Sequence, residues 1–360
     1  KFYVEKINIF GNNITREDVI RNNLAVDEGD AFNELLQTKS LNNLKSLNFF
    51  SKVETEIIDS KSQNKKIINI SVEEKPTGQI MAGAGFGTTG GTVAFGVSEN
   101  NFLGRGIEIS SDLALGADSI KGLISINNPN YKGSNKSLNT SFESTITDKS
   151  ADFGYKTNKT GFTIGSGFEF YDDLYWNTGI SSYVEKIETD STASTNMKKQ
   201  EGSYFDTYFN QTFSYDKRNQ KYKTSNGYIS RLTQNIPLIS DSYTLTNGYD
   251  YKIYNQWRDE NIFSLGIHLK TTNALNEDNV KLSERLFLPS AKLRGFEGGK
   301  VGPKDGTDFI GGNYMSTINL ATTLPQILPN LQNTDFSLFL DVANIWGVDY
   351  DSTLEDDENI

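Results

Sequence analysis

The sequence predicts a small α+β domain with the order β-α-α-β-β, followed by an antiparallel all-β barrel that crosses a membrane. Three observations support this fold class. Apolar residues follow helical spacing only within residues 1–75. From residue 79 onward, strand-sized segments of alternating apolar and polar residues replace that spacing. The composition has 31 Gly, 17 Tyr and 22 Phe but only 7 Pro, which is typical of a largely β chain.

Residues 1–75 show the pattern of a generic small α/β domain. A first strand is expected near Val4, and Thr15–Asp18 resembles a capping box that starts a short helix through Ile20. Apolar residues at helical spacing indicate a second helix: Phe32, Leu35, Leu36, Leu41 and Leu44. Two further strands are expected: Ser51–Ile58 and Lys66–Glu73. Lys75–Gly78 then breaks the pattern, which ends the domain at about residue 75.

The rest of the chain reads as a series of about thirteen strands, the last being Phe336–Trp346. Many segments approach the ~9–11 residues that a tilted strand needs to cross a bilayer. Long polar loops are expected at three places: 147–160, 188–203 and 285–312. Long loops that alternate with short turns are typical of outer-membrane barrels. A soluble β-sandwich also alternates, but the strand lengths and the loop asymmetry favour the membrane barrel.

The strand count predicts an incomplete barrel over residues 79–360. Single-chain bacterial barrels have an even number of strands, because the sheet must close. An odd count, followed by the acidic and unpatterned Asp349–Ile360, suggests that the chain stops inside a loop. Since Lys1 leads directly into strand-like sequence, we also expect the chain to begin inside a longer protein.

The composition excludes several kinds of chemistry. The chain has no Cys, which excludes thiolate metal sites and cysteine nucleophiles, and His268 is the single His. The formal net charge of −11 argues against nucleic acid as the main partner. Sites that need a thiolate or two histidines therefore lack material, and we expect no cofactor and no metal site.

The stretch Arg285–Gly312 is too long and too rich in glycine for an ordinary hairpin turn. It carries apolar residues that a disordered loop would not need: Leu293, Phe296, Val301, Phe309 and Ile310. At its centre is Leu293-Arg294-Gly295-Phe296. The planar fork of Arg294 suits a buried carboxylate, so we expect the loop to fold back onto an acidic partner. The alternative is a plain surface loop with one basic residue.

Asp341 is the candidate partner. The apolar face of its strand consists of alternate residues: Phe336, Leu338, Leu340 and Val342. Asp341 therefore points to the opposite, polar face. A carboxylate inside a barrel needs water or a cation, and Arg294 is the best candidate. The alternative is a solvated aspartate.

The first predicted strand of the barrel is poor in side chains on one face, which carries Met81 and three glycines. Its residues are Gln79, Ile80, Met81, Ala82, Gly83, Ala84, Gly85, Phe86 and Gly87. Such a strand packs and pairs weakly, which suits a seam that opens. The alternative is that the glycines leave room for something inside the barrel.

Several stretches in the same order carry a family resemblance. They are Gly83–Gly91, Val97–Gly106, Asn128–Tyr131, Tyr215–Arg218, Ser225–Gly227, and Leu293–Phe296 followed by Val301–Pro303. Together these motifs, which cover nearly the whole chain, resemble the BamA family, the barrel subunits of the bacterial outer-membrane β-barrel assembly machinery. The family's usual form of the last motif is V-R-G-F.

The resemblance implies a POTRA domain in the periplasm, followed by thirteen strands of a sixteen-stranded barrel in the outer membrane of a Gram-negative bacterium. It implies a non-enzymatic role: the assembly and insertion of β-barrel proteins, whose strands are templated at a lateral gate by β-augmentation of the first strand. The implied partners are unfolded outer-membrane proteins, membrane lipid, and accessory assembly lipoproteins that bind the POTRA domain.

The resemblance also implies roles for single residues. The loop would enter the barrel lumen, where Arg294 would pair with acidic residues on neighbouring strands. Asp341 matches one of them, and the second matching position holds Ala321, which leaves the salt bridge with one carboxylate. Two other functions stay open: a related transporter of the same superfamily, for two-partner secretion or autotransporter assembly, and a passive porin with an appended domain.

Overall fold

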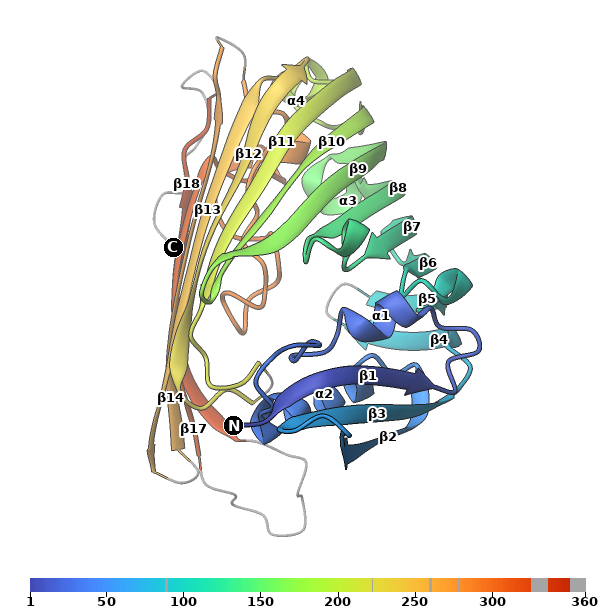
Figure 1. The fold of residues 1–360 in the computed structure, drawn as a ribbon. Coiled ribbons are helices and arrows are strands. Elements are labelled where there is room, and N and C mark those ends of the chain that lie inside the picture. Colours follow the sequence, from blue (N-terminus) through green and yellow to red (C-terminus); the bar gives the residue numbers. More distant parts are fainter. Residues whose placement is uncertain (88–89, 222, 259–260, 277–278, 325–335, 350–360) are drawn as a thin grey trace. The chain divides into compact units, whose positions relative to one another are not determined.

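The computed structural model describes residues 1–360 except 88–89, 222, 259–260, 277–278, 325–335 and 350–360 (Figure 1). The chain forms two compact units. The first unit consists of Lys1–Ala84, Val93–Leu113 and Leu123–Ser141. The second consists of Gly85–Thr92, Ala114–Gly122 and Phe142–Ile360.

The N-terminal part of the first unit is a three-stranded sheet with two helices, in the predicted order β-α-α-β-β. Its elements are β1 (Tyr3–Phe10), α1 (Glu17–Arg21), α2 (Glu34–Ser46), β2 (Phe50–Asp59) and β3 (Lys65–Glu74). The strand order is β1-β3-β2, with β1 parallel and β2 antiparallel to β3. Apolar residues from every element form its core: Val4, Ile7, Ile20, Leu44, Val53, Ile68 and Ile70.

Two local predictions in this domain are wrong. The N-cap of α1 is Arg16 and makes no side-chain capping bond, whereas Thr15 was expected to cap the helix. The Thr15 hydroxyl instead accepts a hydrogen bond from the side chain of Asn101, at 2.8 Å, so a distant partner replaces the local cap. In α2, Leu35 is 79% exposed and does not belong to the core face that the spacing suggested. The cap of α2 is Asn33, whose side chain accepts from the Leu35 amide.

Most of the remaining described residues form a 13-stranded sheet, which confirms the predicted number of strands. Its members are β4 (Gly78–Gly87), β5 (Gly90–Glu99), β6 (Glu108–Gly116), β7 (Ser119–Asn128), β8 (Ser137–Lys149), β9 (Tyr155–Tyr171), β10 (Leu174–Thr189), β11 (Gly202–Asp216), β12 (Gly227–Ser240), β13 (Thr244–Arg258), β14 (Asn261–Ala274), β17 (Tyr314–Thr323) and β18 (Ser337–Trp346). The strands follow one another in chain order, with β4 and β18 at the two ends.

Short elements connect these strands. They are η1 (Phe102–Gly104), η2 (Tyr131–Gly133), α3 (Ser150–Phe153), α4 (Thr195–Lys198), η3 (Leu282–Glu284) and the small hairpin of β15 (Lys304–Asp305) and β16 (Asp308–Phe309). No helix in the described part of the chain has the length and apolar character to cross a membrane.

In the second unit, one face of the sheet is apolar and the other is polar, because successive side chains of a strand point to opposite faces. Leu265, Leu320 and Leu340 are neighbours across β14, β17 and β18, and Leu340 is 59% exposed. The adjacent row, Gly266, Asn319 and Asp341, lies on the opposite face and is polar. An apolar row of partly or largely exposed side chains that alternates with a polar row is typical of strands that face lipid on one side.

The predicted loop at 147–160 is wrong. β8 continues to Lys149 and β9 begins at Tyr155, so that only α3 and Gly154 separate them. Polar residues of this stretch are paired within the sheet, for example Lys156 with Glu188 and Asn158 with Lys186. The polar residues of this stretch therefore belong to the ends of β8 and β9 and do not indicate a loop. The loop expected at 188–203 does separate β10 from β11, whereas most of the acidic run Asp349–Ile360 lies outside the described residues.

Candidate functional site

The segment between β14 and β17, which we call the return loop (residues 279–313), lies against one face of the sheet of the second unit (orange in Figure 1). Six of its apolar residues are buried: Val280, Leu282, Leu286, Leu288, Val301 and Ile310. All of these except Val280 belong to two clusters with residues of the strands and of α4. One cluster includes Tyr155 and Met197, and the other includes Met315 and Ile345. The apolar content of the loop is therefore used for packing.

The return loop is closed at its base by its own backbone. Leu286 and Gly312 exchange two hydrogen bonds, of 2.8 and 2.9 Å. Gly311 has φ +69°, and a Cβ at this position would lie 2.4 Å from the Leu286 carbonyl oxygen. Only glycine fits this combination of left-handed backbone and close approach.

Arg294 and Asp341 form a bidentate ion pair. Arg294 Nε and Nη2 lie 2.7 Å from the two carboxylate oxygens, and the Arg294 amide donates to Oδ2 at 3.0 Å. The side chain of Asp341 is 2% exposed and that of Arg294 is 34% exposed. The guanidinium also lies over the ring of Phe339, 3.8 Å from its centroid, a favourable cation–π arrangement. Three charge-assisted bonds on one carboxylate fix both the position and the orientation of the loop tip.

A neutral amide on the neighbouring strand completes this pair. Asn319 Nδ2 donates to Asp341 Oδ1 and to the Lys292 carbonyl oxygen, both at 2.8 Å. Asn319 is the direct register partner of Asp341, whereas Ala321, the position expected from the family pattern, lies opposite Phe339. In the described part of the chain, Asp341 is the one carboxylate that pairs with Arg294.

The other residues of the predicted motif have different environments. Leu293 packs against the cluster around Leu286 and Leu288. Gly295 has φ +90° and follows Arg294 in a tight turn, in which the Phe296 amide donates to the Leu293 carbonyl at 3.3 Å. Phe296 is 50% exposed. The motif therefore attaches the loop through Leu293 and Arg294, and its glycine provides the turn.

A second ionic site on the return loop was not predicted. Lys281 Nζ contacts the carboxylates of Asp206 and, at 3.4 Å, of Glu185 and Glu284. The side chains of Lys281, Asp206 and Glu185 are 4–5% exposed. Burial acts to lower the pKa of Lys281, but the three carboxylates outweigh it and raise the pKa above its usual range. Lys281 is therefore a buried cation.

Hydroxyl groups satisfy the remaining acceptors of this cluster. Ser283 Oγ donates to Glu185 at 2.7 Å, Tyr208 donates to Glu284, and Ser240 donates to Asp206. A sequence signal for this site existed. Glu185 of β10 and Asp206 of β11 are diagonal neighbours across the two paired strands. Both carboxylates therefore lie on the same, covered face of the sheet. No pattern in the sequence indicates which basic residue contacts these two carboxylates.

The predicted first strand of the barrel, residues 79–87, lies in β4, the terminal strand of the described sheet. Its large apolar side chains are exposed: Ile80 to 86% and Phe86 to 94%. A Cβ at Gly83 or Gly85 would have no heavy atom within 4 Å. The strand thus combines a terminal position in the sheet order with few side-chain contacts.

Comparison with known proteins identifies relatives over the whole chain. Residues 101–359 match the Omp85 superfamily domain, and residues 2–75 match the POTRA domain, described as a surface antigen variable number repeat. The outer membrane protein assembly factor BamA of Nitratidesulfovibrio vulgaris is 24% identical and covers 99% of this chain and 46% of its own length. BamA of Neisseria meningitidis serogroup B is 23% identical, with 98% and 48% covered. The chain thus spans about half the length of the curated relatives it matches.

Solved structures show the same fold. BamA from Haemophilus ducreyi lacking POTRA domains 1–3 has a TM-score of 0.81 at 22% identity, with 96% of this chain and 72% of that chain covered. CdiB from Escherichia coli has a TM-score of 0.57 at 10% identity, with 99% and 74% covered. These likenesses confirm the predicted fold class of an α+β domain followed by antiparallel barrel strands.

Proposed function

The chain belongs to the Omp85 superfamily, and from this premise we propose that it takes part in the assembly and insertion of β-barrel proteins in the bacterial outer membrane. Relatives over nearly its whole length are named outer membrane protein assembly factors. The proposed role is non-enzymatic, because it rests on strand pairing and membrane insertion rather than on a reaction. The proposed partners are unfolded outer-membrane proteins, lipid, and accessory lipoproteins that bind the POTRA domain on the periplasmic side.

The sparse side-chain packing of β4, the first strand of the sheet, is the observation that carries this proposal. A strand at the end of a sheet presents backbone N–H and C=O groups that can pair with an added strand. Addition of a strand to such an edge is a recurring mode of polypeptide recognition. Gly83 and Gly85 reduce side-chain packing, which keeps the pairing of β4 weak. We propose that residues 79–87 form one side of a lateral gate and template the strands of a substrate.

The return loop supports a gate rather than an open pore. Its buried apolar residues and its two ionic sites hold it against the polar face of the sheet. In this proposal, five residues hold the loop in the lumen: Leu293, Arg294, Gly295, Phe296 and Asp341. The attached loop keeps the neighbouring barrel strands in register while β4 pairs with the strands of a substrate. A passive porin would need the space that such a loop fills.

The general function is tested by reconstitution. The protein is incorporated into liposomes, and the folding of an added, urea-unfolded outer-membrane barrel is followed by its heat-modifiable mobility on gels. We expect faster folding than in liposomes without the protein. Equal folding rates would overturn the role in assembly.

Templating at β4 is tested separately by disulfide capture. The chain has no cysteine, so a single introduced cysteine is the only thiol. Cysteine replaces Ala82 or Ala84 in β4, and the substrate carries one cysteine in its terminal strand. We expect cross-links at both positions during folding. Leu269→Cys in β14 is the matched control, because Leu269 is exposed but its strand pairs with β13 and β17 on both sides. Equal cross-linking at Leu269 would overturn templating at β4 and leave the assembly role standing.

The two alternatives are separated from assembly by different measurements. A transporter for a single secreted partner or autotransporter would support one substrate, so its depletion would spare other barrel proteins, whereas loss of an assembly factor reduces all of them. A porin would show steady single-channel conductance in planar bilayers. We expect low conductance that rises when residues 285–312 are deleted.

A further inference from the structure

Two turns of the first unit have the same backbone conformation. One is residues 99–106, which we call the docked turn, and the other is residues 128–135, which we call the open turn. Leu103 and Lys132 occupy equivalent positions with φ 53° and 54°, and the glycines that follow them both have φ 69°. The residues two positions further on, Gly106 and Asn135, also have positive φ.

The side-chain bonds that close the two turns are also equivalent. Asn101 Oδ1 accepts from the Gly106 amide at 2.7 Å, and Asn130 Oδ1 accepts from the Asn135 amide at 2.9 Å. The residue two positions before each asparagine caps it in the same way: Glu99 accepts from the Asn101 amide, and Asn128 accepts from the Asn130 amide. The two turns are thus copies of one element on successive hairpins.

The docked turn is occupied by a loop of the POTRA domain. The Arg16 amide donates to the Gly104 carbonyl oxygen at 2.8 Å. Asn101 Nδ2 donates to the Thr15 hydroxyl, also at 2.8 Å. A Cβ at Gly104 would lie 1.9 Å from the Ile14 carbonyl oxygen, so the polypeptide backbone of residues 14–16 rests directly on this turn.

The same positions of the open turn are vacant within the described part of the chain. A Cβ at Gly133 would meet no heavy atom within 4 Å. No described residue donates to the Gly133 carbonyl oxygen, and none accepts from Asn130 Nδ2. The open turn therefore keeps free the carbonyl, the side-chain amide and the glycine surface that its copy uses to hold a polypeptide.

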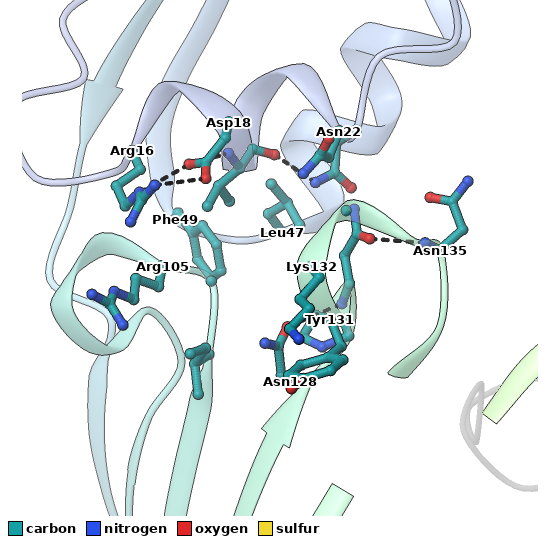
Figure 2. Close-up of a pocket in the computed structure, with 17 residues that line it drawn as sticks. Arg16, Asp18, Asn22, Leu47, Phe49, Arg105, Asn128, Tyr131, Lys132 and Asn135 are labelled. Atoms are coloured by element: carbon teal, nitrogen blue, oxygen red, sulfur yellow. Dashed lines mark hydrogen bonds and ion pairs between the residues drawn. The ribbon is translucent and has the colours of Figure 1, made fainter. Parts of the chain in front are cut away.

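A pocket of about 800 Å³ adjoins the open turn (Figure 2). Its lining includes Phe49 and the N-terminal half of α1, and Figure 2 shows Arg105 on one side of Phe49 and Lys132 on the other. Three cations and one anion line it: Arg16, Arg105, Lys132 and Asp18. The lining thus has a formal charge of 3 − 1 = +2, whereas the whole chain has −11. A cationic pocket on an acidic protein favours an anionic guest.

We propose that the open turn is a second docking site, which receives an acidic segment of a partner polypeptide in the way that the docked turn receives residues 14–16. A backbone amide of the segment donates to the Gly133 carbonyl, and a hydroxyl or carbonyl accepts from Asn130. Asp or Glu side chains of the segment pair with Lys132 and Arg105. The guest is a polypeptide rather than a lipid headgroup, because the occupied copy shows that this turn is shaped for polypeptide backbone. This inference does not depend on the proposed assembly function.

The test uses a fluorescein-labelled peptide that copies the docked loop. Its sequence is that of residues 12–18 with glutamate in place of Arg16, Asn-Asn-Ile-Thr-Glu-Glu-Asp. The full chain in zwitterionic detergent is titrated into the peptide, and binding is measured by fluorescence anisotropy. We expect saturable binding. In the double variant Arg105→Glu/Lys132→Glu, binding should weaken about tenfold, the order expected from reversing two largely exposed ion pairs.

Two controls make the result specific. The double variant Lys39→Glu/Lys61→Glu makes the same change in net charge at exposed lysines outside the pocket and should bind as the unchanged protein does. A neutral peptide, Asn-Asn-Ile-Thr-Gln-Gln-Asn, should bind the unchanged protein more weakly, a comparison that does not depend on the folding of any variant.

Three outcomes would overturn the proposal. The first is the absence of saturable peptide binding. The second is an equal loss in both double variants, which would indicate attraction by net charge alone. The third is binding of anionic phospholipid vesicles that the Arg105/Lys132 variant loses while the peptide does not bind, which would identify a lipid site.

Discussion

The return loop is attached to the sheet at two ionic sites of different design. At Lys281, one cation contacts three carboxylates, and three of these four groups are almost completely buried. At Arg294, one cation meets one carboxylate through three well-directed hydrogen bonds, and the guanidinium keeps about a third of its surface exposed. The first site depends on charge among buried side chains, and the second depends on geometry.

The difference decides what each site loses when its cation is removed. The Lys281 cluster has a formal charge of −2, and in the described part of the chain Lys281 is the one cation that forms salt bridges with its three carboxylates. An uncompensated charge in a buried site is more costly than the loss of a contact. At the other site, Asp341 still accepts a hydrogen bond from the side-chain amide of Asn319 after the Arg294 side chain is removed. The unpredicted site should therefore contribute more to stability than the predicted one.

Lys281→Met should have the largest effect. It leaves Asp206 and Glu185 buried without a cation, and removal of one partner from a buried ion pair costs about 3–5 kcal/mol. The free energy of unfolding in detergent, from urea titrations followed by tryptophan fluorescence, measures the loss. Lys61→Met, at an exposed position of the first unit, is the control and should change little.

A charge-neutral combination sharpens this prediction. If repulsion among the carboxylates causes the loss, then Lys281→Met combined with Asp206→Asn and Glu185→Gln should recover a large part of the stability. A triple variant as unstable as Lys281→Met alone would show that packing, and not charge, dominates the cluster.

Arg294→Ala should be the second largest change. It removes two side-chain bonds to Asp341 and the contact with Phe339, and hydrogen bonds to charged groups contribute about 1.5–3 kcal/mol. Heat-modifiable mobility of the protein on gels reports the expected fall in thermal stability. Arg294→Lys keeps the charge but not the planar fork, so it should restore only part of the stability. Full restoration by lysine would contradict a site that depends on geometry.

Most of the fold could be predicted from local patterns. Strand alternation, such as that of Leu338, Leu340 and Val342, identifies the last strand to within one residue of its observed start. The prediction failed where polar residues occur inside a strand, as at Lys156 and Asn158, because alternation between two polar faces leaves no apolar signal. It also failed at Thr15, whose partner Asn101 lies 86 residues away in the chain.

In the candidate site, only the residues with a distinctive sequence context could be predicted. Arg294 lies at the centre of a glycine-rich loop that could fold inward, and Asp341 lies on the polar face of its strand, so Arg294 was the best candidate partner for Asp341. Lys281 has no such mark in the sequence, because its neighbours Val280 and Leu282 read as ordinary apolar residues. Its partners come from β10 and β11, and only the path of the loop brings them together.

Asn319→Ala should have a smaller effect, since it tests the neutral member of the Arg294 site. The variant loses the bonds of one amide to Asp341 and to the Lys292 carbonyl, and a typical hydrogen bond contributes about 1 kcal/mol. Urea titration should show a loss below that of Arg294→Ala. A larger loss than for Arg294→Ala would mean that the amide, and not the ion pair, holds the loop tip.

Glu74→Gln should be the smallest change and extends the comparison to a carboxylate held by backbone amides. Glu74, in β3 of the first unit, accepts from the amides of Asn13, Ile14 and Thr15 at 2.9, 2.9 and 2.6 Å. Burial acts to raise the pKa of Glu74, but these hydrogen bonds outweigh it and hold the pKa below its usual value. A neutral glutamine accepts the same bonds more weakly, which should cost about 1 kcal/mol near neutral pH.

The pH dependence of this change identifies the charge as its cause. Because the pKa of Glu74 is lower in the folded than in the unfolded chain, its stabilisation is complete above the unfolded value of about 4.3. The stabilisation is then lost as the pH falls through the folded value. Hydrogen exchange of the three amides should therefore differ between Glu74→Gln and the unchanged protein near neutral pH, and the difference should disappear in acid. A difference that persists in acid would assign the effect to shape, and the loop on the docked turn would then be held by fit rather than by charge.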